Sequence, residues 1–190
     1  MSEVSASEPV KIEGNKLLIN RGQPAESKDA FFGIMEQRVQ RLDSNSYARL
    51  AGAGAAMGRF MGVVFQVPEG KAIEDATIYV NEDDFRVNGE DFTDVIPVTV
   101  RHEIFEMWTY AKNGWSLSPP PERIGTKNRV AVAHGLATCE EYRYAFEIGK
   151  ADRYLEYIEK WSSRLPERER QKLITENVEA YRKAMTQVKR

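Results

Sequence analysis

The stretch from residue 98 to residue 113, VTVRHEIFEMWTYAKN, constrains the fold more than any other part of the sequence. It has no internal glycine or proline and is rich in large apolar side chains, which favours a helix. Pro97 suits a helix start, because its fixed backbone angle is tolerated in a first helical turn. The dipeptide Asn113-Gly114 is a stop signal at the other end. We therefore expect one helix between Pro97 and Asn113.

Three polar side chains in this helix point to a metal site. His102 and Glu106 are four residues apart, so they lie one turn apart on the same helix face. A metal ion can bind between an imidazole and a carboxylate placed in this way. Glu103 points about a quarter-turn to one side, where its carboxylate could act on a water held by the metal without being a ligand. These are the roles found in a metal-assisted hydrolase.

A second helix, expected from about residue 130 to residue 149, carries two more candidate groups. His134 and Glu141 fall on one face of it, among small and apolar side chains, so both would be directed inward. A buried charge without a partner is costly, so this face requires a partner or a metal. Either residue could be the third ligand; we prefer Glu141, which leaves His134 for the outer shell or for substrate. Glu140 lies off this face and is expected to be solvated.

The pattern resembles the zincin metallopeptidases, in the branch where a His-Glu-x-x-His helix is followed by a second helix that supplies a glutamate ligand. The similarity covers HEIFE, which begins at His102, and CEEYRYAFE, which begins at Cys139. It implies that His102 and Glu106 bind zinc and that Glu141 is the downstream ligand. It also implies that Glu103 is the general base.

The chain departs from the zincin motif at one ligand. The motif has a second histidine where this chain has Glu106. Two carboxylates and one imidazole would suit manganese or iron as well as zinc, because harder ions accept oxygen ligands. We expect a divalent metal, with zinc first, and the resemblance implies a peptide or protein substrate.

The rest of the sequence predicts an α+β fold, with a small, mostly antiparallel sheet, an N-terminal helix and two long C-terminal helices. We expect a flexible tail at 1–9, one zincin-like domain over 10–163, and an amphipathic helix over 164–190 packed on it. The individual elements expected are a hairpin at 10–12 and 17–19, a helix over 27–42, strands at 61–67 and 76–80, a tight turn at Asn88-Gly89, an extended loop over 115–128, a continuation of the second helix to about 162, and a helix after Pro166 that reaches Val188.

Charge and composition limit the classes of partner. The chain has 27 basic and 29 acidic residues and a formal charge of −2, so no basic field favours nucleic acid. The single Cys139 cannot form an internal disulfide, and the start MSEVSASEPVK lacks the layout of a secretory signal. No apolar run approaches the roughly 18 residues that span a bilayer. We expect a cytoplasmic protein that binds neither nucleic acid nor membrane.

A non-catalytic interaction protein of the same architecture is the alternative. Glu103 and Glu106 would then line a solvated helix face and pair with Arg101 or Lys112, while His134 would be a hydrogen-bonded core residue. The charged C-terminal helix would bind a protein partner or a second copy of the chain. Its expected packing stripe consists of Ile174, Val178, Tyr181, Met185 and Val188.

Overall fold

The computed structural model describes residues 11–13, 16–18, 26–51, 57–66, 76–113 and 124–188. Over these ranges the chain forms six α-helices, one four-stranded sheet and two small hairpins, which confirms the predicted α+β class. The helices are α1 Glu26–Glu36, α2 Ser44–Ala51, α3 Ile96–Lys112, α4 Ile124–Glu147, α5 Ala151–Ser162 and α6 Glu167–Val188. The strands are β1 Lys11–Glu13, β2 Lys16–Leu18, β3 Val39–Leu42, β4 Met57–Phe60, β5 Val63–Gln66, β6 Thr77–Asn81, β7 Arg86–Val87 and β8 Glu90–Asp91.

The main sheet has the strand order β3-β6-β5-β4. Its β4–β5 and β5–β6 pairs are antiparallel and its β3–β6 pair is parallel, so the sheet is mostly antiparallel, as predicted. The two small hairpins, β1–β2 and β7–β8, are also antiparallel. In the second of these, Asn88 and Gly89 have φ angles of 53° and 82°, the backbone expected for an Asn-Gly hairpin turn.

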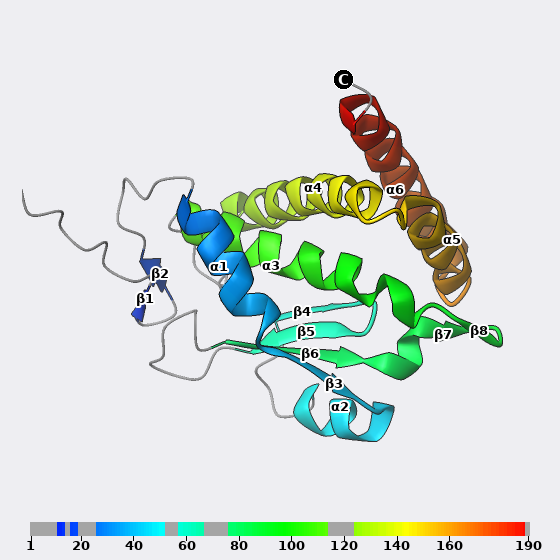
Figure 1. The fold of residues 1–190 in the computed structure, drawn as a ribbon, viewed down its shortest axis with the longest axis horizontal. Helices are drawn as coiled ribbons and strands as arrows, with labels where there is room; N and C mark the ends of the chain where they lie inside the picture. Colours follow the sequence, from blue (N-terminus) through cyan, green and yellow to red (C-terminus); the bar gives the residue numbers. More distant parts are fainter. Residues whose placement is uncertain are drawn as a thin grey trace, which may run out of the picture.

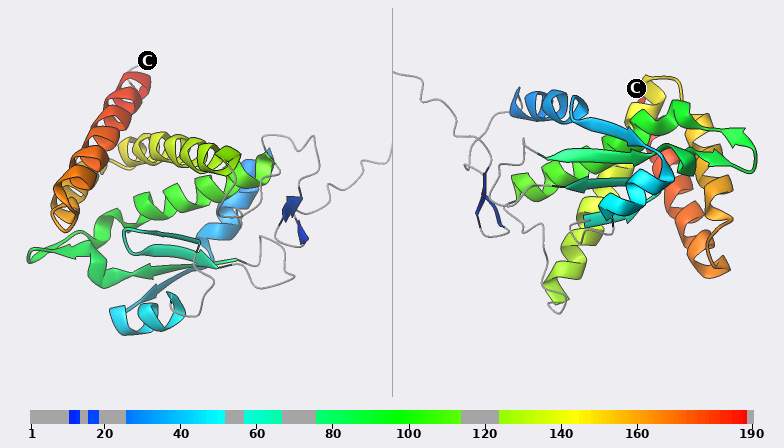
Figure 2. Two further views of the ribbon diagram at one scale, coloured as in Figure 1. Left: turned by 180° about the vertical axis from the view of Figure 1, so that it is seen from behind. Right: turned by 90° about the horizontal axis from the view of Figure 1, so that it is seen from below.

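The helices are stacked on the sheet in layers, with α3 in the middle. Figure 1 shows α3 lying along the sheet and α4 lying over α3 on the side away from the strands. The view from behind in Figure 2 shows the same order, and α6 packs against α4 and α5 at one end of the molecule. Because α3 is covered on two sides, most of its side chains are buried. The hydrophobic core includes Phe65, Ile78, Val80, Phe85, Phe92, Ile104, Met107, Tyr142 and Tyr157.

The N-terminal helix is shorter than predicted. α1 ends at Glu36, whereas the periodicity of apolar residues predicted a helix that continues to Leu42. Residues Val39–Leu42 instead form β3, in which Val39 is paired with Ile78 of β6. The pairing strand lies far along the chain, so local periodicity could not show that this segment is a strand.

Two further boundaries differ from the sequence prediction. The strand expected at 61–67 is the second half of a hairpin, because Met61 and Gly62 form a turn between β4 and β5 with φ angles of 53° and 74°. The helix expected from residue 130 begins at Ile124, inside the predicted loop over 115–128. The earlier part of that loop and the expected tail at 1–9 lie outside the described residues.

The most buried residues of the last helix lie beside the predicted stripe, although Tyr181 of that stripe packs against Tyr142 and Phe146 of α4. α6 contacts both α4 and α5, so its buried face is displaced by about one position along the sequence. The predicted residues Ile174, Val178, Tyr181 and Met185 are only half-buried, and the Val188 side chain lies outside what the structure describes. The buried stripe consists of Leu173, Asn177, Ala180 and Ala184.

Glu140 is buried at the junction of three helices, so the prediction that it is solvated was wrong. Its carboxylate pairs with Arg143 of α4 at 2.8 Å, Arg101 of α3 at 3.4 Å and Lys28 of α1 at 3.5 Å. Burial on its own would raise the pKa of Glu140, but hydrogen bonds from Arg143 and the positive charges of Lys28 and Arg101 outweigh it and lower the pKa. Three cations therefore satisfy a carboxylate that helical periodicity had placed toward solvent.

No helix within the described ranges is long and apolar enough to cross a lipid bilayer.

Replacing Glu140 by Gln should lower the free energy of unfolding at pH 7 by about 1–3 kcal/mol, because it removes charge-assisted hydrogen bonds at a buried position. The folded-state pKa is lowered, so this stabilisation is present above the ordinary carboxyl pKa and is lost as the pH falls below about 4. Urea unfolding at pH 7 and at acid pH measures both effects. Glu147→Gln is the matched control, since Glu147 pairs with the same Arg143 from an exposed position and should change stability by less than about 0.5 kcal/mol. If Glu140→Gln lowered the free energy of unfolding by the same amount at pH 7 and at acid pH, this account would be contradicted.

Candidate metal centre

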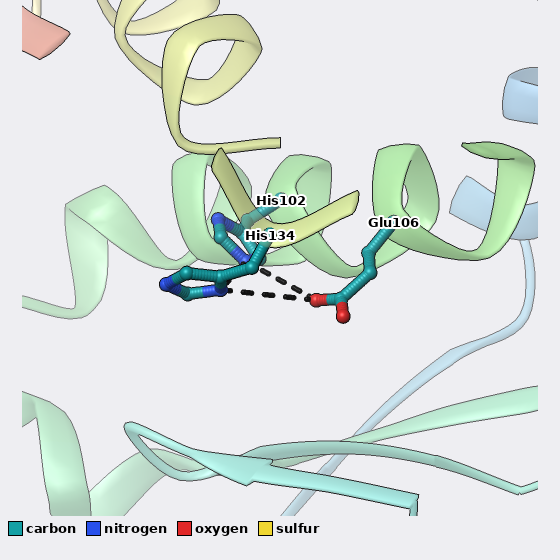
Figure 3. Close-up of side chains that lie close together, drawn as sticks. All are labelled: His102, Glu106 and His134. Atoms are coloured by element: carbon teal, nitrogen blue, oxygen red, sulfur yellow. Dashed lines mark hydrogen bonds and ion pairs between the residues drawn. The ribbon is translucent and has the colours of Figure 1, made fainter. Parts of the chain in front are cut away.

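α3 and α4 bring three metal-binding side chains together. His102 and Glu106 project from the same face of α3, one turn apart, and His134 projects toward them from α4 (Figure 3). His102 is buried, whereas Glu106 and His134 are partly exposed, with side-chain exposures of 19% and 36%. One side of the group is thus closed by the α3–α4 interface, and the other side faces solvent.

The spacing of the three donor atoms is close to that of a tetrahedral metal site. His102 Nε2 lies 3.1 Å from His134 Nδ1 and 3.4 Å from Glu106 Oε2, and His134 Nδ1 lies 3.9 Å from the same carboxylate oxygen. Ligand atoms about 2.0–2.2 Å from a tetrahedral zinc ion stand roughly 3.3–3.6 Å from one another. A small shift of one side chain would therefore allow all three atoms to bind a single ion.

Glu141 contacts the other nitrogen of His102. Its Oε2 lies 2.5 Å from His102 Nδ1, so the carboxylate holds the imidazole with Nε2 facing Glu106 and His134. Carboxylates commonly fix metal-binding histidines in this way from the outer shell. The sequence-based preference for Glu141 as third ligand therefore does not match the geometry, which groups His134 with His102 and Glu106 instead.

Burial, charge and hydrogen bonds together set the pKa values of His102 and Glu106. Burial on its own would lower the pKa of His102, but the negative charge of Glu141 and the hydrogen bonds to Glu106 and Glu141 raise it well above its ordinary value. Burial on its own would raise the pKa of Glu106, but hydrogen bonds to His102 and His134 lower it to about 2. Without an ion, a proton on His102 thus partly neutralises the surrounding carboxylates.

Glu103 is buried beside this cluster. Only 3% of its surface is exposed, and burial is the main reason that its pKa is raised to about 8, with Glu106 and Glu141 adding to the effect and His102 opposing it. The alternative in which Glu103 lines a solvated helix face is therefore wrong. Arg101, which was expected to pair with this face, instead contacts Glu36 and Glu140.

A small cavity connects Glu103 to the candidate ligands. It has a volume of about 10 Å³ and is bordered by His102, Glu103 and His134. A cavity of this size holds about one water molecule. Most of the other residues that line the cavity were not predicted from the sequence, because only tertiary packing brings them together. Helical spacing could have indicated two of them, since Thr99 lies one turn before Glu103 and Thr138 one turn after His134. These remaining residues are Met61, Thr99, Thr138, Glu141, Tyr154, Ile158 and Asn177.

Comparison with known proteins identifies no relative for this chain. No protein-family model, no curated protein and no solved structure matches it. The residues and their geometry are therefore the basis for assigning a function.

Proposed function

We propose that this protein is a metal-dependent hydrolase of the zincin metallopeptidase type, with His102, Glu106 and His134 as the ligands of one divalent ion. The observation that carries the proposal is the approach of their three donor atoms to 3.1–3.9 Å from one another. The contact between Glu141 and the far nitrogen of His102 supports it, since this is the outer-shell arrangement that metal-binding histidines use. The zincin resemblance alone implied a different third ligand.

Zinc fits this donor set best. Two imidazoles and one carboxylate are the protein ligands of many catalytic zinc sites, in which a fourth position stays open for water or substrate. The same set also suits iron, which binds two histidines and one carboxylate in many enzymes, and manganese accepts its carboxylate. A bound ion would supply Lewis acidity, polarising a carbonyl oxygen and making water more acidic.

Glu103 is the proposed acid–base residue, because it borders the same small cavity as His102 and His134. In hydrolysis of an amide, the oxygen of a water molecule bonds to the carbonyl carbon, and the Glu103 carboxylate accepts a proton from that water. The proton then passes to the leaving nitrogen as the carbon–nitrogen bond breaks. A pKa of about 8, raised by burial, lies close enough to neutrality for both steps, and a neighbouring cation would favour the ionised form.

A protein-binding module without catalytic activity is the second candidate. Val132 and Leu136 lie one turn apart on α4 and are 50% and 49% exposed. Large apolar side chains at such spacing form one side of many helix-mediated contacts. This candidate predicts no dependence on metal, so the first experiment below separates the two functions.

The purified protein should contain about one equivalent of divalent metal after dialysis against zinc, measured by elemental mass spectrometry. The variants Glu106→Ala and His134→Ala should lose it, because each removes one of the three proposed ligands. Glu147→Ala is the matched control, since Glu147 is an exposed glutamate on the same helix as His134. Absence of metal from the unaltered protein, even with zinc or manganese added, would refute the proposed function.

Replacing Glu141 by Gln should weaken zinc binding by about 10–100-fold without abolishing it, because the residue orients His102 rather than binding the ion. Titration against a competing chelator gives the affinity. Glu140→Gln is the control: Glu140 is the adjacent residue and is also buried, but it pairs with Arg101 and Arg143, so its loss should affect stability and not zinc affinity. Complete loss of zinc in Glu141→Gln, with retention in His134→Ala, would identify Glu141 as the third ligand.

Replacing Glu103 by Gln should lower the rate of peptide hydrolysis by about 10²–10⁴-fold and leave zinc content unchanged, because it removes the base and not a ligand. The assay is cleavage of a mixed set of fluorogenic peptides by the zinc-loaded protein. An unchanged rate would eliminate Glu103 as the base.

A further inference from the structure

Thr99 differs in its hydrogen bonding from three other threonines that lie within α3, α4 and α6. The hydroxyls of Thr109, Thr138 and Thr175 each donate to the carbonyl oxygen four residues earlier, at 2.9, 2.9 and 2.8 Å. This is the usual way in which a helical threonine satisfies its hydroxyl. The Thr99 hydroxyl is buried and makes no such bond within α3, and its polar contact among the described residues is with the Tyr154 hydroxyl on the wall of the same cavity. A hydroxyl has one donor and two acceptor positions, so this contact leaves Thr99 able to form a further hydrogen bond with a molecule in the cavity.

The Thr99 side chain forms part of the wall of the cavity beside the candidate metal centre. Thr99 and Glu103 are one turn apart on α3, so they border this cavity from the same side. Burial and the charges of neighbouring residues account for the raised pKa of Glu103, and no described residue donates a hydrogen bond to its carboxyl group. In the part of the chain that the structure describes, the Glu103 carboxyl group thus lacks a hydrogen-bond donor, and the Thr99 hydroxyl on the same cavity wall can form a further hydrogen bond.

Most other polar side chains around the cavity are already hydrogen-bonded. Asn177 accepts a hydrogen bond from the Tyr142 hydroxyl and donates one to the Leu173 carbonyl. The Thr138 hydroxyl donates within α4, and Glu141 is paired with His102. A molecule in the cavity would therefore find its hydrogen-bonding groups mainly at Glu103 and at the neighbouring hydroxyls of Thr99 and Tyr154. The volume of about 10 Å³ limits that molecule to a single water.

We propose that this cavity is a water site, in which Thr99 holds one ordered water against the Glu103 carboxyl group. The water donates to a Glu103 oxygen and is fixed by the Thr99 hydroxyl. It thereby sets the rotation of the carboxyl group, so that the second oxygen is directed toward His102 and His134, which border the same cavity. Thr99 is then a positioning residue for proton transfer, a role that rests on the function proposed above. The water site itself does not depend on that function.

Crystal structures of the metal-free full-length chain test the water site. The unaltered protein and Thr99→Ser should show one water within hydrogen-bonding distance of residue 99 and of a Glu103 oxygen, because serine keeps the hydroxyl. Thr99→Val, which has nearly the same shape without the hydroxyl, should lose this water. Thr109→Val is the matched control on the same helix, because the Thr109 hydroxyl donates to a backbone carbonyl outside the cavity. A dry cavity in the unaltered protein, or a water that persists in Thr99→Val, overturns the proposal.

Kinetics of the zinc-loaded protein on the fluorogenic peptides test the positioning role. Thr99→Val should lower kcat by about 10-fold or more at unchanged KM, Thr99→Ser should restore most of it, and Thr109→Val should leave kcat unchanged. Thermal unfolding of each variant separates this effect from loss of folded protein. Unchanged kcat in folded Thr99→Val refutes the positioning role. Absence of turnover in the unaltered protein refutes the hydrolase and this role together, while the crystal structures still decide the water site.

Discussion

The contact between His102 and Glu141 is the interaction on which the candidate site depends. It joins α3 to α4 across 39 residues of sequence, and both side chains are almost completely buried. Each group satisfies the other, and removing either one would leave an unpaired polar or charged group in the interior. The contact also fixes which nitrogen of His102 faces Glu106 and His134. Packing of the two helices and orientation of the candidate ligand therefore depend on one contact.

This arrangement concentrates negative charge. Glu103, Glu106 and Glu141 lie around His102 and His134, and the raised pKa of Glu103 reflects burial together with its two acidic neighbours. A divalent cation would offset this charge more fully than the single proton on His102 does, since it adds two charges between the donors. The electrostatics thus favour a cation at the place where the three donor atoms meet.

Local signals predicted α3 well, because Pro97 lies in its first turn and Asn113 is its C-terminal cap. The spacing of His102 and Glu106 follows from the helix alone. The helix alone does not show whether His134 or Glu141 is the third ligand, because both lie on one face of α4. The way in which α4 crosses α3 decides which nitrogen of His102 each of them contacts. β3 and the buried Glu140 were missed for the same reason: their partners come from other elements.

The exposures around the site show which of its side chains are accessible from solvent. The His102 and Glu141 side chains are 6% and 4% exposed, and the cavity behind them has room for only one water. No substrate side chain fits on that side. Glu106 and His134 are the accessible members of the group, so in the proposed function a substrate would reach the centre past them. Tyr110, one turn beyond Glu106 on α3, has its pKa raised to about 12 by burial and by the charge of Glu106. Tyr110 therefore remains a neutral hydroxyl on the accessible side of the site. In the proposed function, selectivity among substrates would depend on residues near Glu106 and His134.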